Sequence, residues 1–443
     1  MEKLLTVPSE ELVATLDSRR YDESPPSTRS EAQRDRDRIL YSSALLRLGQ
    51  VTQVAAPEVG HSFHSRLTHS LKVAQVARGL AQRLNTLAER DDLPPAATAL
   101  VACLDEDATE AAALGHDLGH PPFGHLAEQV LQSMSQAAGS FEGNAQSFRI
   151  VTRLALRSEL HPGLNLTRRT LNGLLKYPWL REDEEAERER KWGAYGTDRR
   201  YFVWAREGVP EIERTLEAEL MDWADDVTYA VHDMDDFYRA GLIPLDRLTS
   251  SDQERGAFAD HLRARRGERA QALVSAADRL WDGFASLIRT PFAGRAEERV
   301  NLRSLGSALI GRYIAAVELD DASDGERVLL SIDDEVVDEV TALKELTWFY
   351  IIRRPSLAII QRGQAKVIEA LYEMYREAAG RDDPSIFPPV FAERLADAGT
   401  DAAKDRVVID LIAGMTEASA LEIYRQNLGV SVGSLLMRAA GPS

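Results

Sequence analysis

The stretch His116-Asp117-Leu118-Gly119-His120-Pro121-Pro122-Phe123-Gly124-His125 (HDLGHPPFGH) interrupts a chain that is otherwise rich in Ala, Leu, Arg and Glu. It follows the Ala-rich segment 108–117 (ATEAAALGHD), whose composition favours a helix. Gly119 and the double proline end that helix, because proline cannot continue the ladder of backbone hydrogen bonds. The stretch is therefore predicted to be a helix end followed by a sharp turn. Its three histidines and its aspartate form either a structural turn or a site.

Helical periodicity dominates the chain on both sides of this turn. Apolar residues recur every three or four positions in the segments 71–84, 367–375 (VIEALYEMY) and 407–415 (VVIDLIAGM). The clearest pattern covers 212–234, with Ile212, Leu216, Leu220, Trp223, Val227, Ala230, Val231 and Met234 on one helix face. Strand-like alternation is scarce, and VLLSI at 328–332 is the best candidate. The predicted fold class is all-α, with little or no β structure.

The helix predicted over 212–234 carries a second, polar stripe. Asp225, Tyr229 and Asp233 follow each other at i, i+4 and i+8, opposite the apolar face. Periodicity alone favours a solvated acidic side for such a stripe. Tyr229 argues the other way, since an aromatic residue in mid-stripe suits a partly buried surface. A helix whose Asp/Tyr face lines a cavity would show the same pattern.

Three regions are predicted along the chain. Residues 1–30 have little apolar periodicity and are interpreted as a mobile arm. Residues 31–300 form one helical core, and residues 301–443 form a C-terminal helical subregion packed on it. Within the core, the polar segment 250–268 is interpreted as a loop, and the charge run at 181–191 as an exposed helix or loop.

Composition excludes several classes of function. The net charge of −18, from 53 basic and 71 acidic residues, weighs against a face that binds duplex nucleic acid. It leaves single-stranded nucleic acid and a small anionic substrate open, since a phosphate group needs only a few local cations or a metal. The single cysteine, Cys103, excludes an internal disulfide and a Cys-based zinc site. Without a membrane-length apolar run or a signal-peptide pattern, the protein is expected to be cytoplasmic and not membrane-bound.

His116 and Asp117 are the first candidates for metal ligands. Adjacent residues on a helix point about 100° apart, so other elements must close the coordination shell. Imidazole and carboxylate ligands together suit Mn, Fe, Zn or Mg rather than a thiophilic ion. A lone His-Asp pair is usually structural, but His69 in RLTHS and the stripe that contains Asp225 supply the further ligands such a site needs.

The order His69…His116-Asp117…Asp225 resembles the ligand order of the HD superfamily of metal-dependent phosphohydrolases. The residues after His-Asp narrow the resemblance to the deoxynucleoside triphosphate triphosphohydrolases, the dGTPase-like family. The blocks that carry it are DRDRILYSSALLRLGQVTQV at 35–54, RLTHSLKVAQVAR at 66–78, GHDLGHPPFGHLAE at 115–128, FEGNAQSFRIV at 141–151, LLKYPW at 174–179, KWGAY at 191–195, ADDVTYAVHDMDD at 224–236 and IAGMT at 412–416.

The resemblance implies a reaction and a set of roles. A dNTP and water would give a deoxynucleoside and inorganic triphosphate, with dGTP as a candidate for the preferred substrate. The metal ligands would be His69, His116, Asp117 and Asp225, and the catalytic histidine would be His125, oriented by Glu128. Tyr229 and Asp233 would face the sugar, with Gln53 near its 3′-hydroxyl, and Arg66 and His120 would contact the phosphates or the base side. The triphosphate tail would be bound by Lys176, Tyr177 and Lys191.

The same resemblance implies a cofactor and a partner. The metal would be Mn²⁺ or Mg²⁺, with Fe, Ni, Co and Zn as alternatives, and the chain would form a homo-oligomer, a hexamer or tetramer. Two other functions stay open: a different HD-type nucleotidase or phosphodiesterase, and a non-catalytic nucleotide-binding protein. The lysines of KYPW and KWGAY favour the triphosphohydrolase, because a monophosphate has no tail for them to bind.

Hydrolysis of a dNTP would need a positioned histidine and local positive charge, and several of these residues can supply them. Glu128 lies at i+3 from His125, so it can fix the histidine tautomer if the two prolines start a new helix that includes both. Lysines can offset the charge of a triphosphate in a protein with a net charge of −18. The chain departs from the family pattern at Leu46, Val51, His64 and Ala127, none of which is a proposed metal ligand. His61 and His64 are interpreted as surface histidines.

Overall fold

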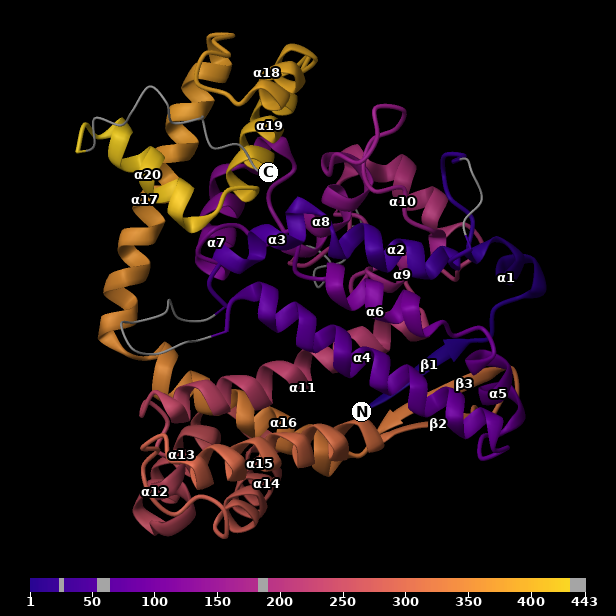
Figure 1. Cartoon of the computed structure of the whole chain (residues 1–443), viewed down its shortest axis with the longest axis vertical. Helices are drawn as coiled ribbons and strands as arrows, with labels where there is room; N and C mark the ends of the chain where they lie inside the picture. Colours follow the sequence, from indigo (N-terminus) through magenta and orange to yellow (C-terminus); the bar gives the residue numbers. More distant parts are fainter. Residues whose placement is uncertain (24–27, 54–63, 182–189, 431–443) are drawn as a thin grey trace.

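The computed structural model describes residues 1–23, 28–53, 64–181 and 190–430. Within these residues the chain is built almost wholly of helices around one small sheet, as Figure 1 shows. The all-α prediction is therefore confirmed. The α-helices are α1 Glu10–Leu16, α2 Glu31–Leu40, α3 Ser43–Arg47, α4 Arg66–Glu89, α5 Pro95–Val101, α6 Glu106–Gly115, α7 His125–Met134, α8 Gly143–Arg149, α9 Arg168–Gly173, α10 Arg199–Arg206, α11 Leu216–Arg239, α12 Leu245–Ser250, α13 Asp252–Arg266, α14 Ala270–Phe284, α15 Ala296–Ala315, α16 Asp334–Thr347, α17 Pro355–Gly380, α18 Pro389–Ala396, α19 Asp401–Ala413 and α20 Glu417–Asn427.

Three long-range helix contacts build the centre of the molecule. Helix α4 packs against α6 and α11, and α2 packs on the other side of α6. In Figure 1, α4 and α11 run side by side across the middle of the fold. The apolar faces predicted for 71–84 and 212–234 are buried in this packing, apart from Ile212, which precedes α11 and is exposed. Helices α4 and α11 carry His69 and Asp225, and His116 directly follows α6, so this packing brings the three residues to one place.

The sheet is antiparallel and has the strand order β1-β3-β2. Its strands are β1 Glu2–Thr6, β2 Val317–Asp321 and β3 Arg327–Ile332. The run predicted at 328–332 is thus a strand. Strand β1 pairs with β3 in a register that puts Leu5 opposite Val328, and both side chains are buried.

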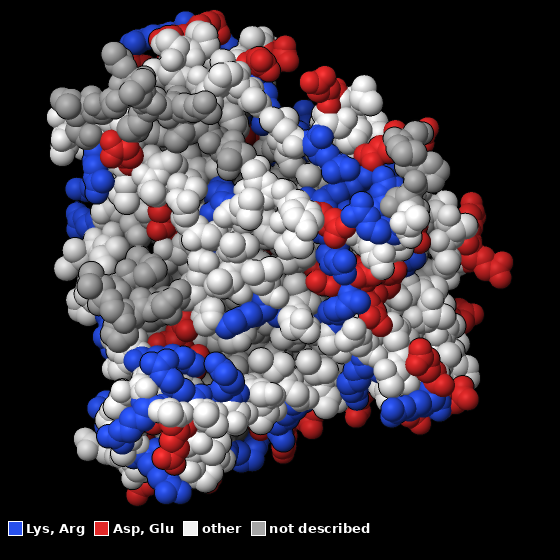
Figure 2. Space-filling model, viewed as in Figure 1, with Lys and Arg blue, Asp and Glu red and all other residues white. Residues whose placement is uncertain are grey.

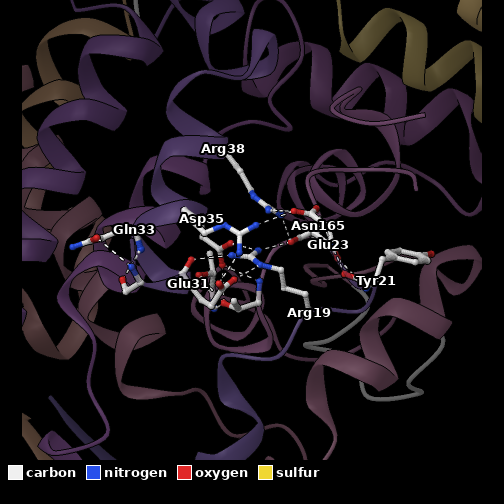
Figure 3. A network of polar contacts seen from close by, with 12 residues as sticks. Arg19, Tyr21, Glu23, Glu31, Gln33, Asp35, Arg38 and Asn165 are labelled. Carbon is white, nitrogen blue, oxygen red and sulfur yellow. Dashed lines mark hydrogen bonds and ion pairs between the residues drawn. The ribbon is translucent and has the colours of Figure 1, made fainter. Parts of the chain in front are cut away.

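Residues 1–23 do not form the mobile arm that their composition predicts. Besides β1, they contribute α1, whose Ser9 side chain caps the helix and whose Leu12 and Leu16 are buried one turn apart. A polar network then holds the following segment against the core, as Figure 3 shows. Arg19 bonds to Asp35 and to the carbonyl of Asn165. The prediction fails because the partners of this segment lie far away in the sequence.

Two further predictions concern the polar segment 250–268 and the charge run at 181–191. The polar segment predicted as a loop over 250–268 forms α13, which Ser251 caps and whose last turn holds three arginines that complement the helix dipole. Of the charge run at 181–191, residues 182–189 lie outside the described residues.

Buried apolar residues form two main clusters. The larger runs from Leu5 to Ile351 and contains α4, α6 and α11. The smaller joins α7 to the C-terminal helices α17, α18 and α19 and includes Phe123 and Met415. Between residue 300 and Ile351, buried apolar residues therefore belong to the larger cluster, and from Val367 onward they belong to the smaller one. The sequence suggests this boundary at residue 300. Long helix α17 runs from the first group of helices to the second in Figure 1.

The surface has a mixed charge pattern on the face drawn in Figure 2. Lys and Arg lie there in small groups between Asp and Glu rather than in one continuous basic area. Among the described residues, every helix is too short or too polar to span a bilayer.

Candidate active site

The HDLGHPPFGH turn is fixed by one close backbone approach. Helix α6 ends at Gly115, and the chain then passes directly over α8. A Cβ at Gly119 would lie 2.1 Å from the carbonyl oxygen of Gly143, so only glycine fits there. Ser147 Oγ accepts from the Gly119 amide at 2.9 Å and donates to the His116 carbonyl at 2.9 Å. The first part of the turn is thereby held against α8. Helix α7 includes His125 and Glu128 as expected, but it starts at His125 and not at the two prolines.

The four predicted metal ligands lie together. Ligand atoms of His69, His116 and Asp117 all lie within 4.8 Å of one another. Asp225 joins them, since its Oδ1 lies 3.0 Å from His69 Nε2 and 3.6 Å from His116 Nε2. Helices α4 and α11 and the turn after α6 therefore supply one largely buried set of two imidazoles and two carboxylates.

The residues fit a divalent cation. His116 Nδ1 donates to the carbonyl of Ala113 at 2.7 Å, which leaves Nε2 as the ligand atom. That Nε2 is buried and has no hydrogen-bond partner among the described residues. Burial lowers the pKa of His116, but the charges of Asp117 and Asp225 outweigh it and raise the pKa to about 9. The two carboxylates thus stabilise positive charge at the position where a cation would bind.

Arg66 and His120 both lie against Asp117. Arg66 Nη1 donates to Asp117 Oδ2 at 2.7 Å, and His120 Nδ1 lies 2.9 Å from Asp117 Oδ1. Although burial raises the pKa of the Asp117 carboxyl, these two neighbours hold it well below its ordinary value. Burial, reinforced by Arg66, lowers the pKa of His120 to about 4, so this ring is neutral near pH 7. Arg66 therefore orients a metal ligand, and its contact with substrate stays a prediction.

A second cluster lies beside the first and contains the predicted catalytic pair. His125 Nδ1 bonds to Glu128 Oε2 at 2.9 Å, and the His125 side chain is 69% exposed. Glu128 is buried, and its Oε1 accepts from the Gly143 amide at 3.0 Å. The His120 ring connects the clusters, since its centroid lies 5.2 Å from that of His125. The i+3 spacing thus places the Glu128 carboxylate on His125 Nδ1, which is the contact that the sequence predicts.

The polar stripe of α11 faces the site rather than open solvent. Asp233 is buried, and Tyr229 lies between it and Asp225 on the same face. Burial raises the pKa of Asp233 to about 8, with Asp236 adding to the effect, and burial with Asp233 raises that of Tyr229 well above 10. Gln53 Oε1 is buried and accepts no hydrogen bond from the described residues. These groups provide neutral donors and acceptors of the kind that binds a sugar.

The pKa of Asp233 predicts how stability depends on pH. Between an unfolded value of about 3.9 and the folded value of about 8, the folded chain holds a proton that the unfolded chain lacks. Stability therefore falls as pH rises through this window. In Asp233→Asn this contribution is absent, so the melting temperature should fall less between pH 6 and pH 9, measured by calorimetry without metal.

The control for this prediction is Asp260→Asn, because Asp260 is an exposed residue of α13. That variant should follow the wild-type pH dependence. If the curves of wild type and Asp233→Asn run parallel from pH 6 to pH 9, the protonated Asp233 is refuted.

The three residues predicted at the triphosphate tail are placed differently from one another. Lys176 pairs with Asp222, and its Nζ lies 3.6 Å from Asp225 Oδ2. Lys191 Nζ lies 3.2 Å from Glu128 and 3.0 Å from Glu142. Tyr177 packs edge-on against Trp179, with ring centroids 5.5 Å apart. Both lysines thus touch carboxylates of the two clusters, and binding of a triphosphate stays a prediction for all three residues.

Sequence reasoning missed several residues around the site. Glu142, within the FEGNAQSF block, is the buried partner of Lys191. His64 is not a surface histidine: its ring and its amide both bond to Asp236, and Lys72 contacts the other ring nitrogen. A sequence signal for this contact was present: Asp236, three residues after Asp233, extends the polar stripe of α11. His61 lies outside the described residues.

Comparisons with known proteins agree with this geometry. The HD domain matches residues 66–230, which span all four metal-ligand candidates, and the phosphohydrolase-associated domain matches residues 330–426. Three relatives carry the name deoxyguanosinetriphosphate triphosphohydrolase-like protein. The one from Streptomyces coelicolor is 38% identical over 90% of this chain and 93% of its own length. The one from Corynebacterium efficiens is 35% identical over 91% of this chain and 92% of its own length. The one from Bifidobacterium longum is 32% identical over 94% of this chain and 87% of its own length.

The matched domains and the buried His/Asp set together indicate a phosphohydrolase with a divalent-metal site. With relatives above 30% identity along nearly the whole chain, this protein belongs to the deoxyguanosinetriphosphate triphosphohydrolase-like family.

Proposed function

We propose that this protein is a metal-dependent dNTP triphosphohydrolase that converts a dNTP and water into a deoxynucleoside and inorganic triphosphate, with dGTP as the first candidate substrate. The observation that carries the proposal is the pair of adjoining clusters. One is a ligand set with a free imidazole nitrogen, and the other is an exposed histidine held by a buried carboxylate. A metal ion would neutralise phosphoryl charge, and a positioned histidine would transfer a proton, so the two clusters supply complementary parts of such a hydrolysis.

His69, His116, Asp117 and Asp225 would hold the cation. A bound divalent ion neutralises phosphoryl charge and activates water. Mn²⁺ or Mg²⁺ is the proposed ion, because carboxylates make up half of the ligand set and thiolates are absent from it. Fe, Ni, Co and Zn also accept imidazole and stay as alternatives.

The chain's own residues supply the proton. In the reaction a bond forms between the water oxygen and the α-phosphorus, and the bond from that phosphorus to the 5′-oxygen breaks. The leaving 5′-oxygen takes up a proton. His125 is exposed toward substrate, and because Glu128 holds its Nδ1, the free Nε2 is the atom that can deliver it. Glu128 is itself fixed by the Gly143 amide and by Lys191, so the ring cannot turn freely.

The remaining residues select the substrate. Tyr229 packed under the ribose would leave no room for a 2′-hydroxyl, and the unpaired Gln53 Oε1 can accept from the 3′-hydroxyl. Lys176 and Lys191 would exchange part of their carboxylate contacts for the triphosphate tail.

The decisive experiment measures triphosphate release. The purified protein is incubated with each dNTP, singly and in mixtures, with Mn²⁺ or Mg²⁺, and products are separated by ion-exchange chromatography. We expect equal amounts of deoxynucleoside and triphosphate. Chelation of the metal should lower the rate by about 10³-fold or more, because charge stabilisation by a metal amounts to several kcal/mol.

Two control substrates test the alternatives. A deoxynucleoside monophosphate and a phosphodiester should react far more slowly than a dNTP, since neither has a tail for the lysines. Faster turnover of either would indicate the nucleotidase or phosphodiesterase. No triphosphate from any dNTP or mixture, with either metal, would refute the proposal in favour of a binding protein.

We also propose that the chain forms a homo-oligomer, a hexamer or tetramer. Helix α17 supports this, since Ile359 and Ile360 are 74% and 50% exposed on it. A partner for the protein beyond its own copies and a dNTP is not proposed: the mixed charges of Figure 2 give no support to duplex nucleic acid, and single-stranded nucleic acid stays open.

A further inference from the structure

The IAGMT motif at 412–416 lies outside both clusters, and none of its residues has a role in the proposed reaction. It forms the end of α19 and the tight connection to α20. Thr416 caps α20 through the Ser419 amide, so that Glu417 is the first residue of the helix. In Figure 1 these C-terminal helices lie above α3 and above α7, the helix that begins at His125.

Glu417 links two separate loops of the site. Its Oε1 accepts from the Thr52 amide at 2.8 Å and from the Phe123 amide at 3.2 Å. Its Oε2 accepts from Thr52 Oγ1 at 2.9 Å. One of these loops leads directly to Gln53, and the other leads to His125 two residues later. A single carboxylate therefore fixes the spacing between the proposed sugar contact and the proposed proton donor.

The Phe123 loop needs such support. Phe123 and Gly124 both have left-handed backbone conformations, with φ of 69° and 62°. A phenylalanine is strained in that region, and such a conformation persists only when its surroundings hold it. Its amide has one described partner, and that is Glu417.

A second contact joins the same segments. Arg47 is buried and donates to the carbonyls of Met415, Leu118 and His120 at 3.0, 2.8 and 2.8 Å. The segment 415–417 is thus attached to the turn 118–123 by an arginine on one side and a glutamate on the other. The C-terminal helices are connected to the catalytic turn by charged hydrogen bonds as well as by apolar packing.

We propose that Glu417 is a positioning residue for the reaction: it holds the Thr52 and Phe123 loops so that Gln53 and His125 face the same substrate. This inference rests on the proposed function for its effect on turnover. The contact itself can be tested without any substrate.

The experiment compares Glu417→Ala, Glu417→Gln and Glu422→Ala, which changes another glutamate of α20, by hydrogen–deuterium exchange and by steady-state kinetics. Alanine removes all three bonds. Glutamine keeps them in one orientation, because its amide oxygen can accept from both backbone amides and its NH₂ can donate to Thr52 Oγ1. In Glu417→Ala we expect exchange in peptides covering residues 52 and 123 to rise about 10- to 100-fold, the size of a lost hydrogen bond to a charged group.

The kinetic expectation is a loss of about 10²-fold in kcat/KM for Glu417→Ala, mostly in kcat, because a small misplacement of reacting groups has that effect. Metal content should equal that of the wild type. Glu417→Gln should restore most of the activity, and Glu422→Ala should match the wild type in both measurements. A merely structural role would instead raise exchange throughout α19 and α20 and lower the amount of active enzyme, and glutamine would not rescue it.

Three outcomes would overturn the proposal. These are unchanged exchange at residues 52 and 123 in Glu417→Ala, faster exchange there with unchanged kcat/KM, and a loss of activity that Glu417→Gln shares fully. If the wild-type protein turns over no dNTP, the proposed function fails by itself, and the exchange rates alone then decide whether Glu417 holds the two loops.

Discussion

Replacing His116 by alanine is expected to abolish metal binding and turnover together. The His116 Nε2 is buried within 3.6 Å of both Asp117 and Asp225, and it has no other partner among the described residues. Without it, the site keeps His69 and two carboxylates but loses one of its two imidazole ligands, so a first-row divalent ion should be held too weakly to survive purification. Turnover should fall by about 10³-fold or more, since several kcal/mol of charge stabilisation are lost with the metal.

Elemental analysis of the purified variant, beside the triphosphate-release assay, measures both effects. The matched control is His261→Ala, because His261 is also buried and ion-paired, with Glu345 at 2.7 Å, but it lies on α13, among the helices at the bottom of Figure 1. That variant should lose stability and keep its metal. A His116→Ala protein with a full complement of metal would exclude His116 as a ligand, whatever its activity.

Much of the fold could be predicted from the sequence because it depends on local patterns. Helix α11 follows from apolar residues three and four positions apart, although it covers Leu216–Arg239 rather than the predicted 212–234, and the end of α6 follows from Gly119 and two prolines. The main failure was the mobile arm predicted for the described residues 1–23. Strand β1 is stable only because it pairs with β3, more than 300 residues later in the chain, and no local signal reveals that partner. The helix at 252–266 did have local signals, in its serine cap and its basic last turn, but its polar composition obscured them.

The candidate site divides in the same way. The ligand set and the His125–Glu128 spacing follow from motif order and helix geometry, and the structure brings these residues together. The contacts that hold the residues around this set could not be predicted. Lys191 bonds to Glu142, His64 to Asp236, and Glu417 to Thr52, and each pair joins segments whose distance in space depends on the complete fold. Roles for the individual residues stay predictions until variants are measured.

Replacing His125 by alanine is expected to leave the metal in place and to remove turnover. His125 is 69% exposed at the start of α7, so alanine there leaves no buried cavity, and its ring makes no contact with the four metal ligands that could loosen them. General acid catalysis by a positioned side chain contributes about 10²- to 10⁴-fold, and the loss in kcat should fall within that range. KM should change little, because the proton is transferred only in the transition state.

The measurement is again metal content beside kcat and KM for the preferred dNTP. Gln129→Ala serves as the matched control, since Gln129 is an exposed residue one turn later on the same helix and should give wild-type values. Glu128→Gln should lie between the two: the amide can keep a bond to His125 Nδ1 or to Lys191, but it no longer places a negative charge beside either. Loss of metal from His125→Ala would contradict this assignment, because it would move His125 from proton transfer to the metal centre and leave the 5′-oxygen without a donor.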